Sequence, residues 1–229
     1  MYPARMEPVE GARLTRVGTD IWVADRELIL PIGIRLPIRM VVMRDCRRRL
    51  LCYSPVDLDP ETLEALGGLG DVAWLAVPNR LHHTFLEPAR RAFAGAQVIG
   101  CAGPAAGAVE ALDEEGALDG FVDYRVVRAS SRFAELVLYH DPSETLVVSD
   151  LISNVTAADA PVKWWFALNG AWGRPGQTRW QRCLHLRDRR SLAAFYRWAM
   201  ARPFRQVSVG RGAMIRDGAR EMVYRLFRR

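Results

Sequence analysis

The stretch that most constrains the fold is Val72–Val77, a short apolar run that ends in Pro78-Asn79. A run of this length, bounded by turn residues, predicts a strand buried on both faces of an α/β sheet. Sheets of this kind place their chemistry in the loops that follow the carboxyl ends of their strands. Two of the chain's four histidines, His82 and His83, follow this strand. We therefore expect a functional site in this loop.

The rest of the pattern predicts a single layered α/β domain over residues 1–229. Strand patterns fill most of the first 150 residues, and helical periodicity begins at Pro161. Short strands are predicted first in Leu14–Val23, which contains Ile21, Trp22 and Val23 after a turn. The other predicted strands are Arg39–Met43, Leu50–Tyr53, Gln97–Cys101, Phe133–Tyr139, Thr145–Ser149 and Gln206–Val209. The predicted helices begin at Pro60 and Pro161 or span Phe85–Phe93, Asp188–Arg202 and Asp217–Phe227. Residues 103–120 are predicted to form a loop with one helical turn.

Composition narrows the class of protein. No uninterrupted apolar run reaches about 18 residues, so we expect no stable membrane insertion. The four cysteines form no CxxC pair and predict reduced, mostly buried thiols of a cytoplasmic protein. Residues 161–229 hold 16 basic and 3 acidic side chains, whereas residues 1–160 hold 16 and 23. This asymmetry is compatible with a nucleic-acid or membrane contact, or with a contact between unlike protein surfaces.

Four segments, in this order, resemble the metallo-β-lactamase superfamily, and within it the branch known as the DUF4336 family. These segments are Leu51–Val56, Gly70–His83, His140–Leu151 and Ser191–Gly212. The resemblance implies a metallo-β-lactamase-like αββα four-layer sandwich. It also implies that metal ligands gather at the carboxyl ends of the inner strands.

The same resemblance shows that the metal motif of the superfamily is degenerate here. The superfamily has H-x-H-x-D-H after the strand that matches Val72–Val77, and at most its final pair survives, as His82-His83. Asp150 matches the carboxylate that bridges two metals. Arg211 matches the last histidine ligand, and a guanidinium cannot ligate a cation. The remaining histidine, normally in a Gly-His-Thr context, has no counterpart in residues 125–133.

The candidate ligand-binding residues are therefore Asn79, His82, His83, Asp150 and Arg211. His82, His83 and Asp150 suffice for one zinc or iron ion, since three protein ligands make a catalytic zinc site. The alternative is that the histidines are hydrogen-bonded loop residues and that Asp150 caps a helix. We expect His83, Asp150 and Arg211 to converge at one sheet edge, and we expect an Arg211–Asp150 ion pair in place of a metal.

Three classes of function follow. The first is a metal-free protein of this fold that binds a small anionic molecule such as a phosphate or carboxylate. The second is a mononuclear metal-dependent hydrolase of an ester, amide or phosphoester, in which the metal lowers the pKa of a bound water. The third is a binder of nucleic acid or of an acidic partner through the basic C-terminal third. We favour the first, with no cofactor or a single zinc or iron ion.

Other chemistry-bearing residues have structural interpretations. His140 precedes Asp141-Pro142 in a predicted turn, and Cys183 and His185 lack a partner pair that would complete a metal site. Five tryptophans, at positions 164, 165, 172, 180 and 198, are interpreted as core and lid packing, with an aromatic substrate platform as the alternative.

Overall fold

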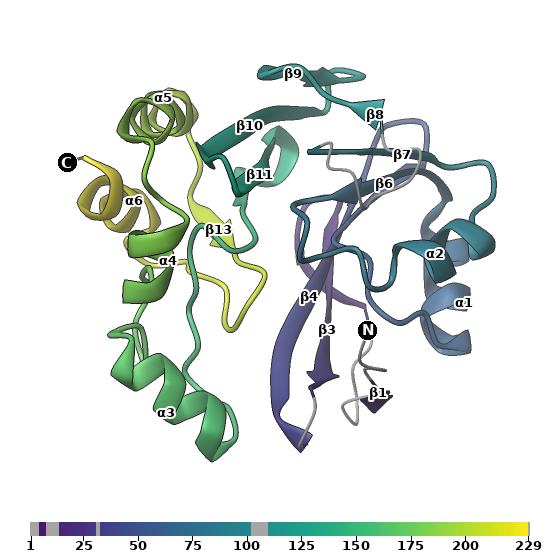
Figure 1. The fold of residues 1–229 in the computed structure, drawn as a ribbon. Coiled ribbons are helices and arrows are strands. Elements are labelled where there is room, and N and C mark those ends of the chain that lie inside the picture. The colour runs from purple at the N-terminus through teal and green to yellow at the C-terminus, as the bar shows by residue number, and fades with distance from the viewer. Residues whose placement is uncertain (1–4, 8–13, 31–32, 102–109, 229) are drawn as a thin grey trace. The chain divides into compact units, whose positions relative to one another are not determined.

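The computed structural model describes residues 5–7, 14–30, 33–101 and 110–228. The chain forms two compact units, residues 1–111 and 112–229, and each is built on its own sheet (Figure 1). The single domain expected over residues 1–229 stays a prediction.

The first unit holds an eight-stranded sheet in the order β1-β3-β4-β5-β6-β7-β8, with β2 paired to β3. Strands β5, β6 and β7 are parallel neighbours, so their carboxyl ends lie at the same edge of the sheet. The strands are β1 Arg5–Glu7, β2 Thr15–Gly18, β3 Ile21–Ile29, β4 Arg35–Arg44, β5 Arg49–Tyr53, β6 Asp71–Val77, β7 Gln97–Gly100 and β8 Glu110–Ala111. The predicted buried strand Val72–Val77 is thus confirmed as most of β6.

Two helices pack on this sheet, α1 (Pro60–Leu69) and α2 (Leu86–Ala92). Helix α1 begins as its sequence predicts, because the Asp59 carboxylate accepts the N–H of Thr62 at 2.7 Å and a proline fills the first turn. Leu66 of α1 and Leu86 and Ala89 of α2 are buried against apolar side chains of the strands. This packing fixes the loop between β6 and α2, in which His82 and His83 lie.

The second unit holds a five-stranded sheet in the order β13-β12-β11-β10-β9. Strands β12 and β13 are parallel, whereas the other pairs are antiparallel. The strands are β9 Glu115–Leu118, β10 Val122–Ser130, β11 Phe133–His140, β12 Thr145–Val147 and β13 Gln206–Ser208. The helices are α3 Ala160–Leu168, α4 Arg179–Leu184, α5 Arg189–Met200 and α6 Ala219–Phe227, with a 3₁₀ turn at Asp141–Ser143. Figure 1 shows α5 and α6 side by side, and both contribute to the apolar core of this unit.

The structure corrects several predictions. The loop expected at residues 103–120 contains strands β8 and β9 in its described part, and its residues 103–109 lie outside the described residues. Strand β10 was not predicted, although Val122, Tyr124 and Val126 alternate with polar residues as in a half-buried strand. Helix α4 was also missed, although Thr178 and Gln181 have the spacing of a capping box, which they form.

The cysteines are less buried than the composition predicts. Cys52 is buried and Cys101 is half-buried, but Cys46 and Cys183 are exposed, and all four are free thiols. Among the helices of the described ranges, none has the length and apolar character needed to cross a bilayer.

Candidate functional site

In the first unit, a group of buried polar side chains lies at the carboxyl ends of β5 and β6. Ser54, directly after β5, has a left-handed backbone (φ 58°), a conformation that non-glycine residues rarely adopt. Its Oγ lies 2.8 Å from Nδ1 of His82, in hydrogen-bond contact, and both residues are buried. This bond fixes the plane of the His82 ring. Sequence reasoning missed Ser54, whose only signal is that it directly follows the predicted strand Leu50–Tyr53.

Asn79 and His83 complete this loop in different ways. Asn79 is buried, and its Oδ1 accepts the N–H of Leu81 at 2.8 Å, so it shapes the turn after β6. His83 is exposed, and its Nδ1 donates to the carbonyl oxygen of Arg80 at 2.5 Å. Both histidines are therefore hydrogen-bonded loop residues, as in the alternative interpretation.

In the second unit, the structure brings together Asp150 and Arg211. Asp150 lies three residues after β12 and Arg211 three residues after β13, and these strands run parallel. The Arg211 Nε donates to Oδ1 of Asp150 at 2.9 Å, and the side chains are 15% and 6% exposed. The predicted Arg211–Asp150 ion pair is confirmed. The convergence of His83 with this pair stays a prediction.

Two glycines allow the Arg211 loop to approach its neighbours. At Gly212 the backbone has φ +93°, and a Cβ would lie 2.1 Å from the carbonyl oxygen of Asn154. At Gly210 a Cβ would lie 2.8 Å from Oγ of Ser149. Both positions therefore require glycine for close backbone packing. The N–H of Asn154 also donates to the Arg211 carbonyl at 3.0 Å, which holds the backbone of Arg211 in place.

Glu135 of β11 holds the loop that carries Asp150. This fully buried carboxylate accepts the backbone N–H groups of Ser149, Asp150 and Leu151 at 2.8, 2.7 and 3.0 Å. Burial, together with the nearby charge of Asp150, raises the pKa of Glu135 to about 8. Sequence reasoning missed it, yet Glu135 shares a strand face with Phe133 and with the other inward positions, which signals a carboxylate in the core.

The donor chemistry of this part of the site does not fit a metal ion. The carboxylate that matches a metal bridge already binds a guanidinium, whose positive charge would repel a cation in the same place. Within the described ranges, no three His, Cys, Asp or Glu side chains gather into a metal-binding group. We therefore derive no reaction step through a metal.

In this arrangement, Asp150 does not occupy every N–H donor of Arg211. Its Nε is occupied by Asp150, whereas its Nη1 is buried and has no hydrogen-bond partner among the residues that the structure describes. A buried N–H group without an acceptor is costly, so an incoming acceptor is favoured. A planar guanidinium matches the paired oxygens of a carboxylate or phosphate. This corner of the second unit can therefore bind an oxyanion.

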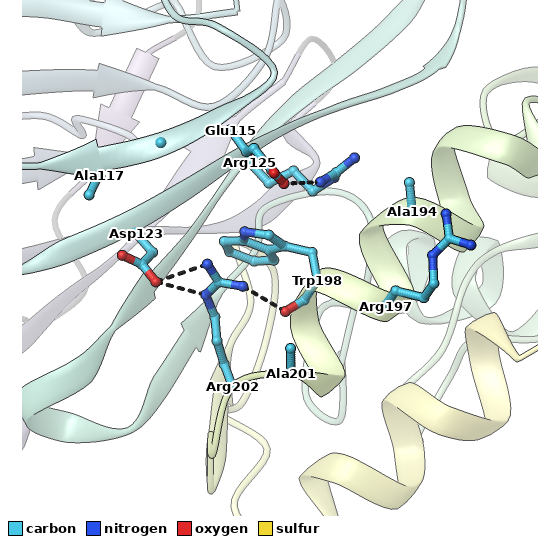
Figure 2. Close-up of a pocket in the computed structure, with 10 residues that line it drawn as sticks. Glu115, Ala117, Asp123, Arg125, Ala194, Arg197, Trp198, Ala201 and Arg202 are labelled. Atoms are coloured by element: carbon cyan, nitrogen blue, oxygen red, sulfur yellow. Dashed lines mark hydrogen bonds and ion pairs between the residues drawn. The ribbon is translucent and has the colours of Figure 1, made fainter.

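A second arginine-rich region of this unit has two of its three arginines in ion pairs. It is a pocket of about 650 Å³ between β9, β10 and α5. Figure 2 shows Trp198 of this pocket between the two ion pairs, Arg202 with Asp123 and Arg125 with Glu115. The Arg202 guanidinium also covers the Trp198 ring at 3.9 Å from its centroid. The paired charges and the covered ring make this pocket a weaker anion site than Arg211.

The structure also bears on the predictions for His140, His185 and the five tryptophans. His140 is buried and contacts Oγ of Ser143 at 2.7 Å, in agreement with a structural role. His185 packs against the rings of Phe133 and Trp180. The tryptophan prediction is wrong in part, because Trp198 is buried and Trp172 half-buried, whereas the tryptophans at 164, 165 and 180 are exposed. Their helices, α3 and α4, turn these rings away from the apolar core of the unit.

No model of a known protein family matches the chain, and no curated protein matches it either. Solved structures do. The flavodiiron core of Flv1 from Synechocystis sp. PCC6803, soaked with metal, is similar with a TM-score of 0.62 and 12% identity, over 97% of this chain and 59% of that chain. The metallo-β-lactamase FIM-1 from Pseudomonas aeruginosa, in its mono-zinc form, has a TM-score of 0.62 and 11% identity, over 99% and 96%. A fragment of the putative diflavin flavoprotein A 5 from Nostoc sp. PCC 7120 has a TM-score of 0.63 and 12% identity, over 99% and 97%.

These neighbours define the class of protein. The chain has the α/β fold of the metallo-β-lactamases, as the sequence predicts. At 11–12% identity the likeness extends to the fold alone.

Proposed function

We propose that the chain is a metal-independent, DUF4336-like protein of the metallo-β-lactamase fold, with a degenerate metal site that binds a small oxyanion. The observation that carries the proposal is the guanidinium of Arg211, which is tethered through Nε to Asp150 while its buried Nη1 has no acceptor in the described part of the chain. Arg211 brings a fixed positive charge to a position that matches a metal ligand, and this charge favours the binding of an anion.

The local structure supports a preorganised anion site. The two glycines and the Asn154 bond fix the backbone of Arg211, and the Asp150 contact fixes its side chain. Fixed donors lose little conformational entropy when a ligand binds. We further propose that Asn79, His82 and His83 are polar ligand-binding residues of the first unit, and that the protein works in the reducing cytoplasm, in keeping with its four cysteines, which form no CxxC pair.

The experiment is a titration with inorganic phosphate, sulfate and acetate, followed by calorimetry and by the shift in melting temperature. We expect Arg211→Lys to weaken phosphate binding at least about tenfold, because a lysine keeps the charge but loses the two-pronged geometry. The matched control is Arg205→Ala, which removes an 81% exposed arginine elsewhere in the same unit. Equal phosphate affinity in Arg211→Lys and the unaltered protein would contradict the proposal.

A second candidate, a mononuclear metal-dependent hydrolase, is favoured by one observation. Ser54 holds the ring of His82 by its Nδ1, as outer groups orient the histidine ligands of metal sites. Elemental analysis of protein purified without chelator separates the two candidates.

We expect elemental analysis to find no dinuclear centre, because Arg211 replaces a ligand by a cation. Two equivalents of zinc, iron or manganese per chain would refute this expectation, and one equivalent would favour the hydrolase. Arg211→His serves as the comparison variant, because it restores a neutral nitrogen donor beside Asp150 and should gain weak zinc binding.

A further inference from the structure

Exposed apolar side chains of this protein are concentrated on two helices of the second unit. Among the described residues, six large hydrophobic side chains are exposed, and five of them belong to α3 and α4. These five are Trp164, Trp165, Leu168, Trp180 and Leu184, with exposed fractions from 44% to 73%. A cluster of this kind on a soluble protein marks an interaction surface.

The spacing places these side chains on coherent helix faces. On α3 the three residues lie at i, i+1 and i+4, and on α4 the two residues lie at i and i+4. Asn169, at the end of α3, joins the helices: its carbonyl accepts the N–H of Arg179 at 2.9 Å, and its Oδ1 accepts the N–H of Trp180 at 3.3 Å. Figure 1 shows α3 and α4 next to each other. We call the five side chains the tryptophan patch.

The segment that carries the tryptophan patch is rich in basic side chains that form no ion pair among the described residues. Residues 160–190 contain one acidic side chain, Asp188, and seven basic ones, all of them exposed: Lys163, Arg174, Arg179, Arg182, Arg187, Arg189 and Arg190. None of the seven forms an ion pair within the described part of the chain. Arginines elsewhere, such as Arg39, Arg44 and Arg49, have carboxylate partners. The segment therefore presents apolar rings and uncompensated cations together.

A pocket adjoins this surface. Its volume is about 610 Å³, and its lining includes Arg174 and Arg182 together with Asp217 and Glu221, of which Glu221 is already paired to Arg225. Gln177 also lines the pocket, and among the described residues its buried Nε2 has no hydrogen-bond acceptor. An anionic headgroup oxygen would supply this acceptor and meet the two unpaired arginines.

We propose that the tryptophan patch and its basic surround adsorb the protein onto an anionic lipid bilayer. Tryptophan prefers the interface between headgroups and acyl chains, and leucine side chains enter the acyl region. The negative surface of the cytoplasmic leaflet attracts nearby arginine and lysine side chains. The surface would lie on the membrane without crossing it.

Two other partners fit the observations less well. A second copy of the chain would bring the same seven unpaired cations face to face, and like charges repel. A single-stranded nucleic acid would stack on the tryptophans and contact the arginines. It would leave Leu168, the most exposed of the five side chains, without an apolar partner.

Flotation of the full chain with lipid vesicles tests the proposal. We expect binding to vesicles with about 30% phosphatidylserine at low salt, weak binding to phosphatidylcholine alone, and loss of binding at about 0.5 M salt. Brominated acyl chains should quench the tryptophan fluorescence of the bound protein. Trp164→Ser with Leu168→Ser should reduce vesicle binding at least about tenfold, and because both positions are exposed this change should leave the melting temperature unchanged.

Charge variants test the contribution of the basic side chains separately from that of the apolar side chains. Arg174→Ala with Arg182→Ala should weaken vesicle binding about 25-fold, at about fivefold per basic side chain near an anionic surface. The matched controls are Arg91→Ala with Arg205→Ala, both highly exposed, and Leu81→Ser, the exposed hydrophobic outside the patch. Controls that weaken binding as much as the patch variants would overturn the proposal. So would a dimer dissolved by the tryptophan variant, or binding to single-stranded RNA but not to vesicles.

Discussion

Glu135→Ala is expected to lower the free energy of unfolding by at least about 3 kcal/mol, because three buried backbone N–H groups lose their acceptor at once. Each buried donor left unsatisfied costs about 1–3 kcal/mol. Urea denaturation at constant pH measures the change. A matched control is Glu115→Ala on β9, which removes a carboxylate that is 60% exposed and should have a small effect.

The loop that Glu135 holds is the one that carries Asp150. Its three bonded residues follow β12 in succession, so the carboxylate defines the path of the chain between the strand and the ion pair. Glu135→Ala should therefore also weaken phosphate binding, because Arg211 depends on Asp150 for its position. Unchanged stability in Glu135→Ala would show that the loop holds its shape without this acceptor.

The charge state of Glu135 gives this prediction a pH dependence. Burial raises the pKa of Glu135 from its ordinary value of 4.5 to about 8, so the folded protein binds this proton more tightly than the unfolded chain does. The stabilisation that results is fully present below pH 4.5 and is lost as the pH rises toward 8. Glu135→Gln removes this titration, so its deficit in stability should be larger at pH 5 than at pH 8.5.

A deficit of Glu135→Gln that grows with pH would indicate that Glu135 is ionised in the native protein. Three N–H donors also favour an ionised carboxylate, which would lower the pKa. If the deficit of Glu135→Gln grows with pH, the backbone bonds outweigh burial, and Glu135 is a buried charge in the native protein.

Local patterns were sufficient to predict the framework of the fold. The apolar run that became β6 and the Asp59 cap of α1 are short-range signals, and the structure has both. Strand β10 was missed although the alternation of its apolar and polar residues is itself a local signal. The partners of Asp123 and Arg125, namely Arg202 and Glu115, were not predictable, because such pairing depends on tertiary contacts that no local window contains.

The residues of the candidate site likewise differ in whether the sequence alone predicts them. Asp150 and Arg211 were predictable together because each follows a strand and the resemblance aligns both with metal ligands. Ser54 was not, because its role depends on His82 reaching back to the end of the neighbouring parallel strand. The exposed tryptophans were mispredicted because large aromatic residues at helical spacing are usually buried. Only the packing of α3 and α4 shows that these rings face outward.

Arg211→Ala is expected to destabilise the protein by about 3–5 kcal/mol, because it leaves the Asp150 carboxylate buried without its counter-charge. The loss should be greater at pH 8 than at pH 5, since Glu135, whose pKa is raised to about 8, is protonated at pH 5 and then does not repel the Asp150 carboxylate. Thermal unfolding at both pH values measures this difference.

Asp150→Asn completes a double-mutant cycle with Arg211→Ala. If the pair acts as a unit, the double variant should be more stable than Arg211→Ala alone, because no buried charge remains unpaired. A coupling energy near zero would mean that Arg211 contributes no more than an exposed arginine such as Arg205. The idea that an ion pair has replaced the metal would then have to be given up, and with it the anchored guanidinium on which oxyanion binding depends.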